Sequence, residues 1–177
     1  MNTVNYGYYP ESNVSGSSTN VVDAPVTVVV PNSTMQLVTV KPSYVKWNNP
    51  LNIRVSANAW QGKLSDSQRT QKNFEEFESL DYGTRAAIKN LLTYYSRGLD
   101  TLRKIISTWA PATENNTTGY ISNVSNSLSI KPDDVLNLKD KSVMSGLVSA
   151  MSYIEKGKSQ ALPQSYVFEV INKFNLI

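Results

Sequence analysis

Helical periodicity from residue 81 onward is the feature that most constrains the fold of this chain. Apolar residues recur there at three-to-four spacing in five short stretches, at about 81–98, 99–109, 114–128, 142–156 and 166–174. Gly98, Pro111, Gly157 and Pro163 separate several of these stretches, as expected for residues that end or precede helices. Five amphipathic helices joined by short loops predict a compact, mostly helical domain.

The N-terminal segment has a different composition. Residues 2–20 are rich in Asn, Ser, Gly and Tyr and predict an extended arm. Residues 21–40 contain β-branched runs interrupted by prolines, which predict two short strands. Two strands do not make a stable sheet, so we expect them to add to another sheet or pair with another chain. The residues expected to anchor this arm are Val26, Val28, Val30, Leu37, Val38 and Val40.

The helical pattern and the β-branched N-terminal composition together predict a two-part protein of the α+β class, mostly α. Residues 1–46 form the β-rich arm used in assembly, and residues 47–177 form the helical domain. The length of 177 residues suits one main core with an appendage.

Composition excludes several classes of function. The chain has no Cys and no His, which excludes thiolate nucleophiles, Ser-His-Asp catalysis and imidazole metal sites. We therefore predict no metal site and no cofactor. The 17 Lys and Arg residues are scattered among 14 Asp and Glu residues, so dedicated nucleic-acid binding is not expected. The longest apolar stretch, at 26–30, is too short to span a membrane.

Short motifs follow one another in a fixed order over about residues 47–155. They are NNPLNIR at 48–54, WQG at 60–62, FEEF at 74–77, GTRA at 83–86, GLDT at 98–101, IISTWAP at 105–111 and ENNT at 114–117 followed by YI at 120–121. This order resembles a family of phage and prophage virion structural proteins. The family pattern has Gly where this chain has Leu51 and Arg where it has Thr108. The resemblance implies a location in the virion.

The segment from NNPLNIR to FEEF is also similar, more weakly, to glucosaminidases with a lysozyme-like fold. The resemblance implies a lysozyme-like scaffold for residues 47–177. In those enzymes a general-acid Glu stands on a helix upstream of this segment. Residues 38–47 hold no Asp or Glu here, so we expect little or no cleavage of peptidoglycan.

Glu114 is the candidate catalytic carboxylate in the remaining sequence. It follows the helix that ends at Trp109, whose ring could provide the apolar wall that raises a carboxyl pKa. The alternative is an acidic residue that caps the next helix or lies in its first turn.

Candidate glycan-binding residues are Asn48, Asn49, Asn52 and Trp60. Side-chain amides hydrogen-bond sugar hydroxyls, and an indole ring stacks on a pyranose face. An equally good interpretation is a loop in which the Asn side chains bind the local backbone.

The leading interpretation is a virion structural protein with a lysozyme-like domain that lacks activity. Its expected partners are other virion proteins or copies of itself, which it contacts through the arm. The alternatives are a virion-associated peptidoglycan hydrolase, with Glu114 as the acid, and a non-catalytic module that binds host cell-wall glycan.

Overall fold

The computed structural model describes residues 41–177, which belong to one compact unit spanning residues 39–177. The predicted strands at 21–40 lie outside the described residues. The same is true of the anchoring residues Val26, Val28, Val30, Leu37, Val38 and Val40. The assembly arm therefore remains a prediction.

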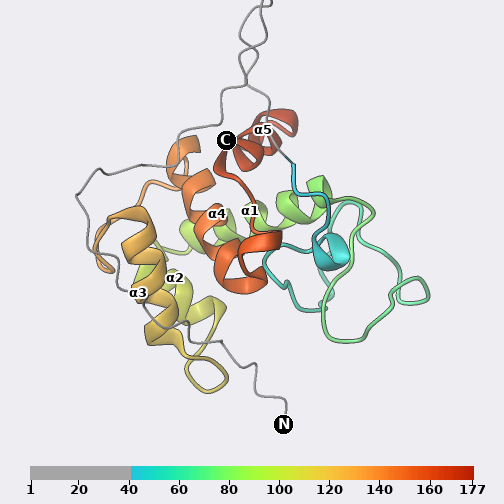
Figure 1. Cartoon of the computed structure of the whole chain (residues 1–177), viewed down its shortest axis with the longest axis horizontal. Coiled ribbons are helices and arrows are strands. Elements are labelled where there is room, and N and C mark those ends of the chain that lie inside the picture. The colour runs from blue at the N-terminus through green and yellow to red at the C-terminus, as the bar shows by residue number, and fades with distance from the viewer. Residues whose placement is uncertain (1–40) are drawn as a thin grey trace, which may run out of the picture. The chain divides into compact units, whose positions relative to one another are not determined.

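Residues 41–177 are mostly helical, as predicted, and contain no strand. Their five α-helices are α1 (Leu80–Ser96), α2 (Leu102–Trp109), α3 (Thr117–Leu128), α4 (Lys141–Lys156) and α5 (Gln164–Lys173), drawn in Figure 1. Two short 3₁₀ helices, η1 (Lys46–Asn48) and η2 (Lys158–Gln160), complete the elements of this part. None of the helices among the described residues has the length and hydropathy needed to cross a membrane.

Side-chain caps determine where four of the helices begin. Ser79, Thr101, Asn116 and Asp140 each accept a hydrogen bond from a backbone N–H in the first turn of α1, α2, α3 and α4. The predicted starts of α2 near residue 99 and α3 near residue 114 are therefore each about a turn too early. Gly157 ends α4 with φ of 73°, as its sequence position predicted.

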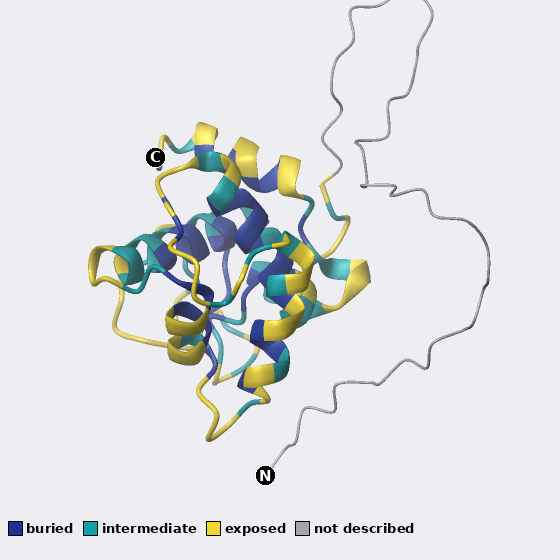
Figure 2. Cartoon of the chain, turned by 90° about the vertical axis from the view of Figure 1, so that its left-hand side faces the viewer, coloured by how far each residue is buried: buried dark blue, intermediate teal, exposed yellow. Residues whose placement is uncertain are grey.

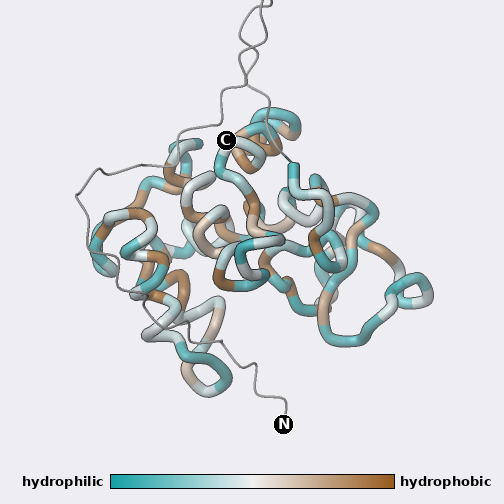
Figure 3. The backbone as a smooth tube through the Cα atoms, viewed as in Figure 1, coloured by the Kyte–Doolittle hydropathy of each residue, from teal (hydrophilic) through white to brown (hydrophobic). Residues whose placement is uncertain are grey.

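Helix α4 lies at the centre of the helical layer and packs against α1, α3 and α5. Its buried residues include Met144, Leu147, Val148 and Met151, each with no exposed surface. Figure 2 shows the buried side of each helix turned toward this common core, and Figure 3 shows apolar and polar residues alternating along the chain. The helical spacing in the sequence therefore corresponds to one shared core.

The segment between η1 and α1 consists of turns and two isolated antiparallel bridges. The bridges pair Arg54 with Phe74 and Lys63 with Phe77. Trp47 stacks on Phe74 with ring centroids 5.4 Å apart. Figure 1 shows this segment beside α1, on the side of the domain away from α2 and α3.

A backbone contact between the segment and α1 explains the Gly of the GTRA motif. A Cβ atom at Gly83 would lie 1.7 Å from the carbonyl oxygen of Asn48. Only glycine allows the NNPLNIR loop to approach the helix this closely. Leu51 of the same loop has no exposed surface, and its neighbour Asn52 has a positive φ of 51°.

Replacing Gly83 by Ala is expected to destabilise the domain by about 3 kcal/mol or more, because the loop must move away from α1. Gly146→Ala in the interior of α4 is the matched control. Its Cβ would meet only side-chain ends, that of Leu128 at 3.3 Å and that of Gln164 at 3.5 Å, so a change within about 1 kcal/mol is expected. Urea unfolding of the variants measures both effects, and equal stability of the two would contradict this account.

Asp81 connects three parts of the described chain through its carboxylate. It accepts hydrogen bonds from Lys41 before η1, at 3.3 Å, and from Tyr166 and Lys173 on α5, the latter at 2.6 Å. Burial by itself raises the pKa of Asp81, but these hydrogen bonds and the Lys41 charge outweigh it and lower the pKa to about 2. The carboxylate form thus holds α1 to α5.

This lowered pKa predicts a loss of stability in acid. The contribution of Asp81 is complete above the unfolded-state pKa of about 4 and is lost as the pH falls toward 2. Asp81→Asn is expected to cost about 1–2 kcal/mol between pH 5 and pH 8, with the difference from the natural chain shrinking below pH 4. Unfolding free energies measured across this range check it, and a difference independent of pH would contradict it.

Candidate functional site

The NNPLNIR loop is held by the side chain of Asn49, which has no exposed surface. Its Nδ2 donates to the carbonyl oxygens of Ile53 at 2.9 Å and Glu75 at 2.8 Å, and its Oδ1 accepts from the Ile53 N–H at 2.8 Å. Asn48 donates in the same way to the Phe77 carbonyl. Both amides therefore bind backbone groups, which is the second of the two interpretations of these residues.

Asn52 has a different role, because its side chain points to the end of α4. Its Nδ2 donates to Glu155 Oε2 at 2.8 Å, and its Oδ1 accepts from the Lys156 ammonium group. The residues in this contact are more than 100 positions apart in the sequence. The loop thus places the Asn52 amide against the carboxyl group of Glu155, which comes from a distant part of the sequence.

Glu155 is the carboxyl group of the candidate site. Its Oε1 accepts hydrogen bonds from Trp109 Nε1, at the end of α2, at 3.2 Å and from the Tyr120 hydroxyl on α3 at 3.1 Å. With Asn52 on the other oxygen, three separate segments of the chain meet at one half-buried carboxyl group. We call Glu155, Asn52, Trp109 and Tyr120 the Glu155 cluster.

Burial raises the pKa of Glu155, and the hydrogen bonds from Asn52, Tyr120 and Trp109, with the Lys156 charge, offset this only in part. Glu155 also lies in the last turn of α4, where the negative end of the helix dipole disfavours a carboxylate. A carboxyl group of this kind can keep its proton closer to neutral pH and can transfer it to a bound molecule.

Lys156 and Lys46 lie beside the Glu155 cluster. Their Nζ atoms lie 5.3 Å and 4.4 Å from the centroid of the Trp47 ring. Burial lowers the pKa of Lys156 to about 8; the Glu155 charge opposes this and the Lys46 charge adds to it. Trp47 and Asn48 adopt positive φ angles of 64° and 52° in this loop, an uncommon conformation for a bulky residue such as Trp47.

The structure places Glu114 apart from such a network. It lies in a turn before α3, and its carboxylate pairs with Arg54 at 2.6 Å, with 52% of the Glu114 side chain exposed. The Trp109 ring, expected to shield Glu114, instead donates its N–H to Glu155. Trp60 is half-buried against the core, and its Nε1 has no hydrogen-bond partner among the described residues.

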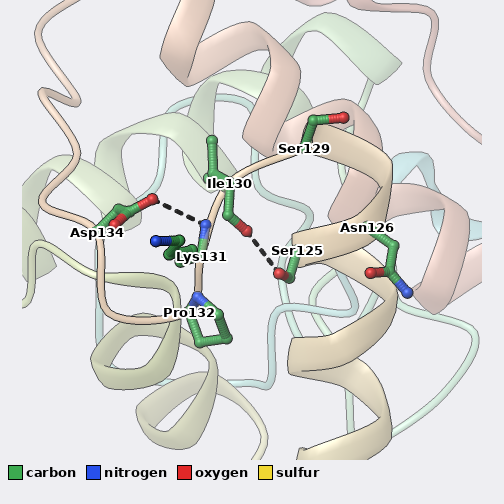
Figure 4. Close-up of a pocket in the computed structure, with 7 residues that line it drawn as sticks. All are labelled: Ser125, Asn126, Ser129, Ile130, Lys131, Pro132 and Asp134. Carbon is green, nitrogen blue, oxygen red and sulfur yellow. Dashed lines mark hydrogen bonds between the residues drawn. The ribbon is translucent and has the colours of Figure 1, made fainter.

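An open pocket of about 440 Å³ lies after the C-terminal end of α3 (Figure 4). Two hydrogen bonds join residues of its lining: the Ser125 hydroxyl donates to the Ile130 carbonyl, and Asp134 accepts from the Lys131 N–H. These bonds close the loop that leaves α3. The pocket lining has no aromatic residue, so the Glu155 cluster is the stronger candidate site.

Sequence reasoning missed Glu155 because the residue looks like part of a solvated helix end beside Gly157. One signal could have indicated it. Acidic residues favour the first turn of a helix, and Glu155 occupies the last turn.

Comparison with known proteins gives one informative relative. Protein P5 of Pseudoalteromonas phage PM2 is 33% identical over 130 residues, which cover 71% of this chain and 75% of the relative. The chain belongs to the family of this phage protein. No protein-family profile matches it. The resemblance to phage proteins drawn from the motifs is thereby confirmed at the level of a phage family, while the motif pattern itself is untested.

Proposed function

We propose that this protein is a structural component of a phage virion. Membership in the family of a phage protein is the observation that carries this proposal. The arm at residues 1–46 attaches the protein to other virion proteins or to copies of itself, and residues 47–177 form the folded module that the attachment holds. Lys41 and Lys46, at the end of the arm, are hydrogen-bonded to this module. The β-branched composition of 21–40 supports the attachment, because isolated strands need a partner.

Two substitutions in the full chain test the attachment. Val28→Asp and Val38→Asp place charges in the predicted strands and are expected to lower incorporation into particles at least about tenfold, because a buried charge disrupts strand pairing. Val135→Asp is the control, since Val135 is 76% exposed in the folded module. Mass spectrometry of gradient-purified particles measures incorporation. Particles that lack the natural chain would contradict the virion proposal.

A second function is favoured by the Glu155 cluster: cleavage of cell-wall glycan on a lysozyme-like scaffold. The similarity to glucosaminidases implies a general-acid Glu on a helix upstream of the NNPLNIR-type segment, whereas Glu155 lies downstream of that segment in the sequence. Glu155 stands on α4 and contacts that segment through Asn52. The expectation of little or no cleavage was based on residues 38–47, which hold no carboxylate. Glu155 supplies one from elsewhere in the chain.

The chemical step uses one carboxyl group and water. Glu155 gives its proton to the glycosidic oxygen as the bond between that oxygen and the anomeric carbon breaks. A water molecule then bonds to the anomeric carbon, and its proton returns to the Glu155 carboxylate. Trp109, Tyr120 and Asn52 hold the carboxyl group in place throughout.

Glu155→Gln is expected to reduce release of soluble fragments from purified peptidoglycan at least about 100-fold, because the amide cannot transfer the proton. Glu114→Gln is the matched control and is expected to keep full activity. Melting temperatures show whether both variants fold. In the natural chain the rate should fall as the pH rises through the raised pKa of Glu155, since the acid must be protonated.

The result that overturns this second function is the absence of new reducing ends with the natural chain. Full activity of a folded Glu155→Gln variant would also overturn it. The virion proposal does not depend on either outcome.

A further inference from the structure

Two lysines converge beside the Glu155 cluster without an acidic partner of their own. The Nζ atoms of Lys46 and Lys156 both lie over the ring of Trp47, at 4.4 Å and 5.3 Å from its centroid. Among residues 41–177 no carboxylate lies within ion-pair distance of either ammonium group. The Glu155 charge raises the pKa of Lys156, and the Lys46 charge, which is also positive, lowers it.

Both lysines are held in place by the fold. The Lys46 backbone N–H donates to Gln160 Oε1 at 2.8 Å, which fixes η1 against η2. The Lys156 ammonium group donates to Asn52 Oδ1 and is half-buried. Lys46 is exposed, so the partly desolvated charge is that of Lys156. A second positive charge close to it is unfavourable, and a bound anion would relieve this repulsion.

The Trp47 ring is poorly placed to stack on a sugar, because Phe74 stacks on it and the two ammonium groups also lie over it. Its electrons instead attract the two cations. The arrangement thus favours a charged group on the ligand rather than a plain pyranose face.

We propose that Lys46 and Lys156 form a subsite for a carboxylate carried by the glycan that enters the Glu155 cluster. The inference rests on the second proposed function and narrows its ligand to glycans of N-acetylated sugars that carry carboxylate groups. Asn52 links the two parts, because one end of its amide holds Glu155 and the other holds Lys156.

Binding of two oligosaccharides tests the subsite. One is the uncharged tetramer of N-acetylglucosamine, and the other is a tetrasaccharide of alternating N-acetylglucosamine and N-acetylmuramic acid, whose lactyl groups are carboxylates. Calorimetry at low temperature with the full chain is expected to show at least about tenfold tighter binding of the charged tetrasaccharide, with the preference shrinking as salt is added.

Lys46→Met and Lys156→Met are each expected to remove most of this preference, measured as the ratio of the affinities for the two oligosaccharides. Lys139→Met is the control, because Lys139 is exposed just before the start of α4, whereas Glu155 and Lys156 lie in the last turn of that helix. Equal affinity of the natural chain for the two oligosaccharides would overturn the subsite, as would failure to bind either one or a preference that survives in both variants. A clear preference without cleavage would retain the subsite and reject only the hydrolase.

Discussion

The described domain depends on the hydrogen bonds of one buried side chain, that of Asn49. Its amide satisfies two carbonyl oxygens and one N–H that are themselves away from water. An apolar residue of similar size would leave the Ile53 N–H and the Glu75 carbonyl unpaired, at about 1–3 kcal/mol for each, whereas the Ile53 carbonyl also accepts from the Glu75 N–H. The loop fixed in this way presses its Asn48 carbonyl against Gly83 of α1. The NNPLNIR and GTRA motifs are therefore two sides of one contact, although about 30 residues separate them.

The same loop determines which side-chain atoms of the Glu155 cluster donate hydrogen bonds and which accept them. Lys156 donates to Asn52 Oδ1, so the amide must present its N–H group to Glu155. Trp109 and Tyr120 donate to the other oxygen of Glu155. The side chain of residue 155 must therefore accept hydrogen bonds at both of its terminal atoms. The two oxygens of a carboxyl group can do so, whereas the amide nitrogen of a glutamine cannot. A carboxyl group is thus placed at a half-buried helix end where burial and the helix dipole both disfavour its charged form. Such a placement is more typical of functional sites than of structural ones.

Much of the helical fold follows from local sequence, and the site does not. Periodicity with Gly98, Gly157 and Pro163 predicted five helices, because core-facing spacing and stop residues act within a few positions. The starts of α2 and α3 differ from the predicted starts at Leu99 and Glu114 because Thr101 and Asn116 cap these helices. Glu114 was chosen for its nearness to Trp109 in sequence. The carboxyl group that Trp109 contacts comes from 46 positions further on, and no short-range pattern encodes that pairing.

The way in which α4 ends explains why the charged groups gather in one place. Gly157 turns the chain with a positive φ directly after Glu155 and Lys156, so the helix stops with both side chains in its last turn. The chain then enters η2, where Gln160 accepts from the Lys46 N–H and brings the start of η1 to the same point. A residue with a Cβ would be strained at this φ, even though no atom lies within 4 Å of the position. The position of Lys46 relative to Lys156 and Glu155 therefore depends on the backbone at Gly157 as much as on any contact between the charged side chains.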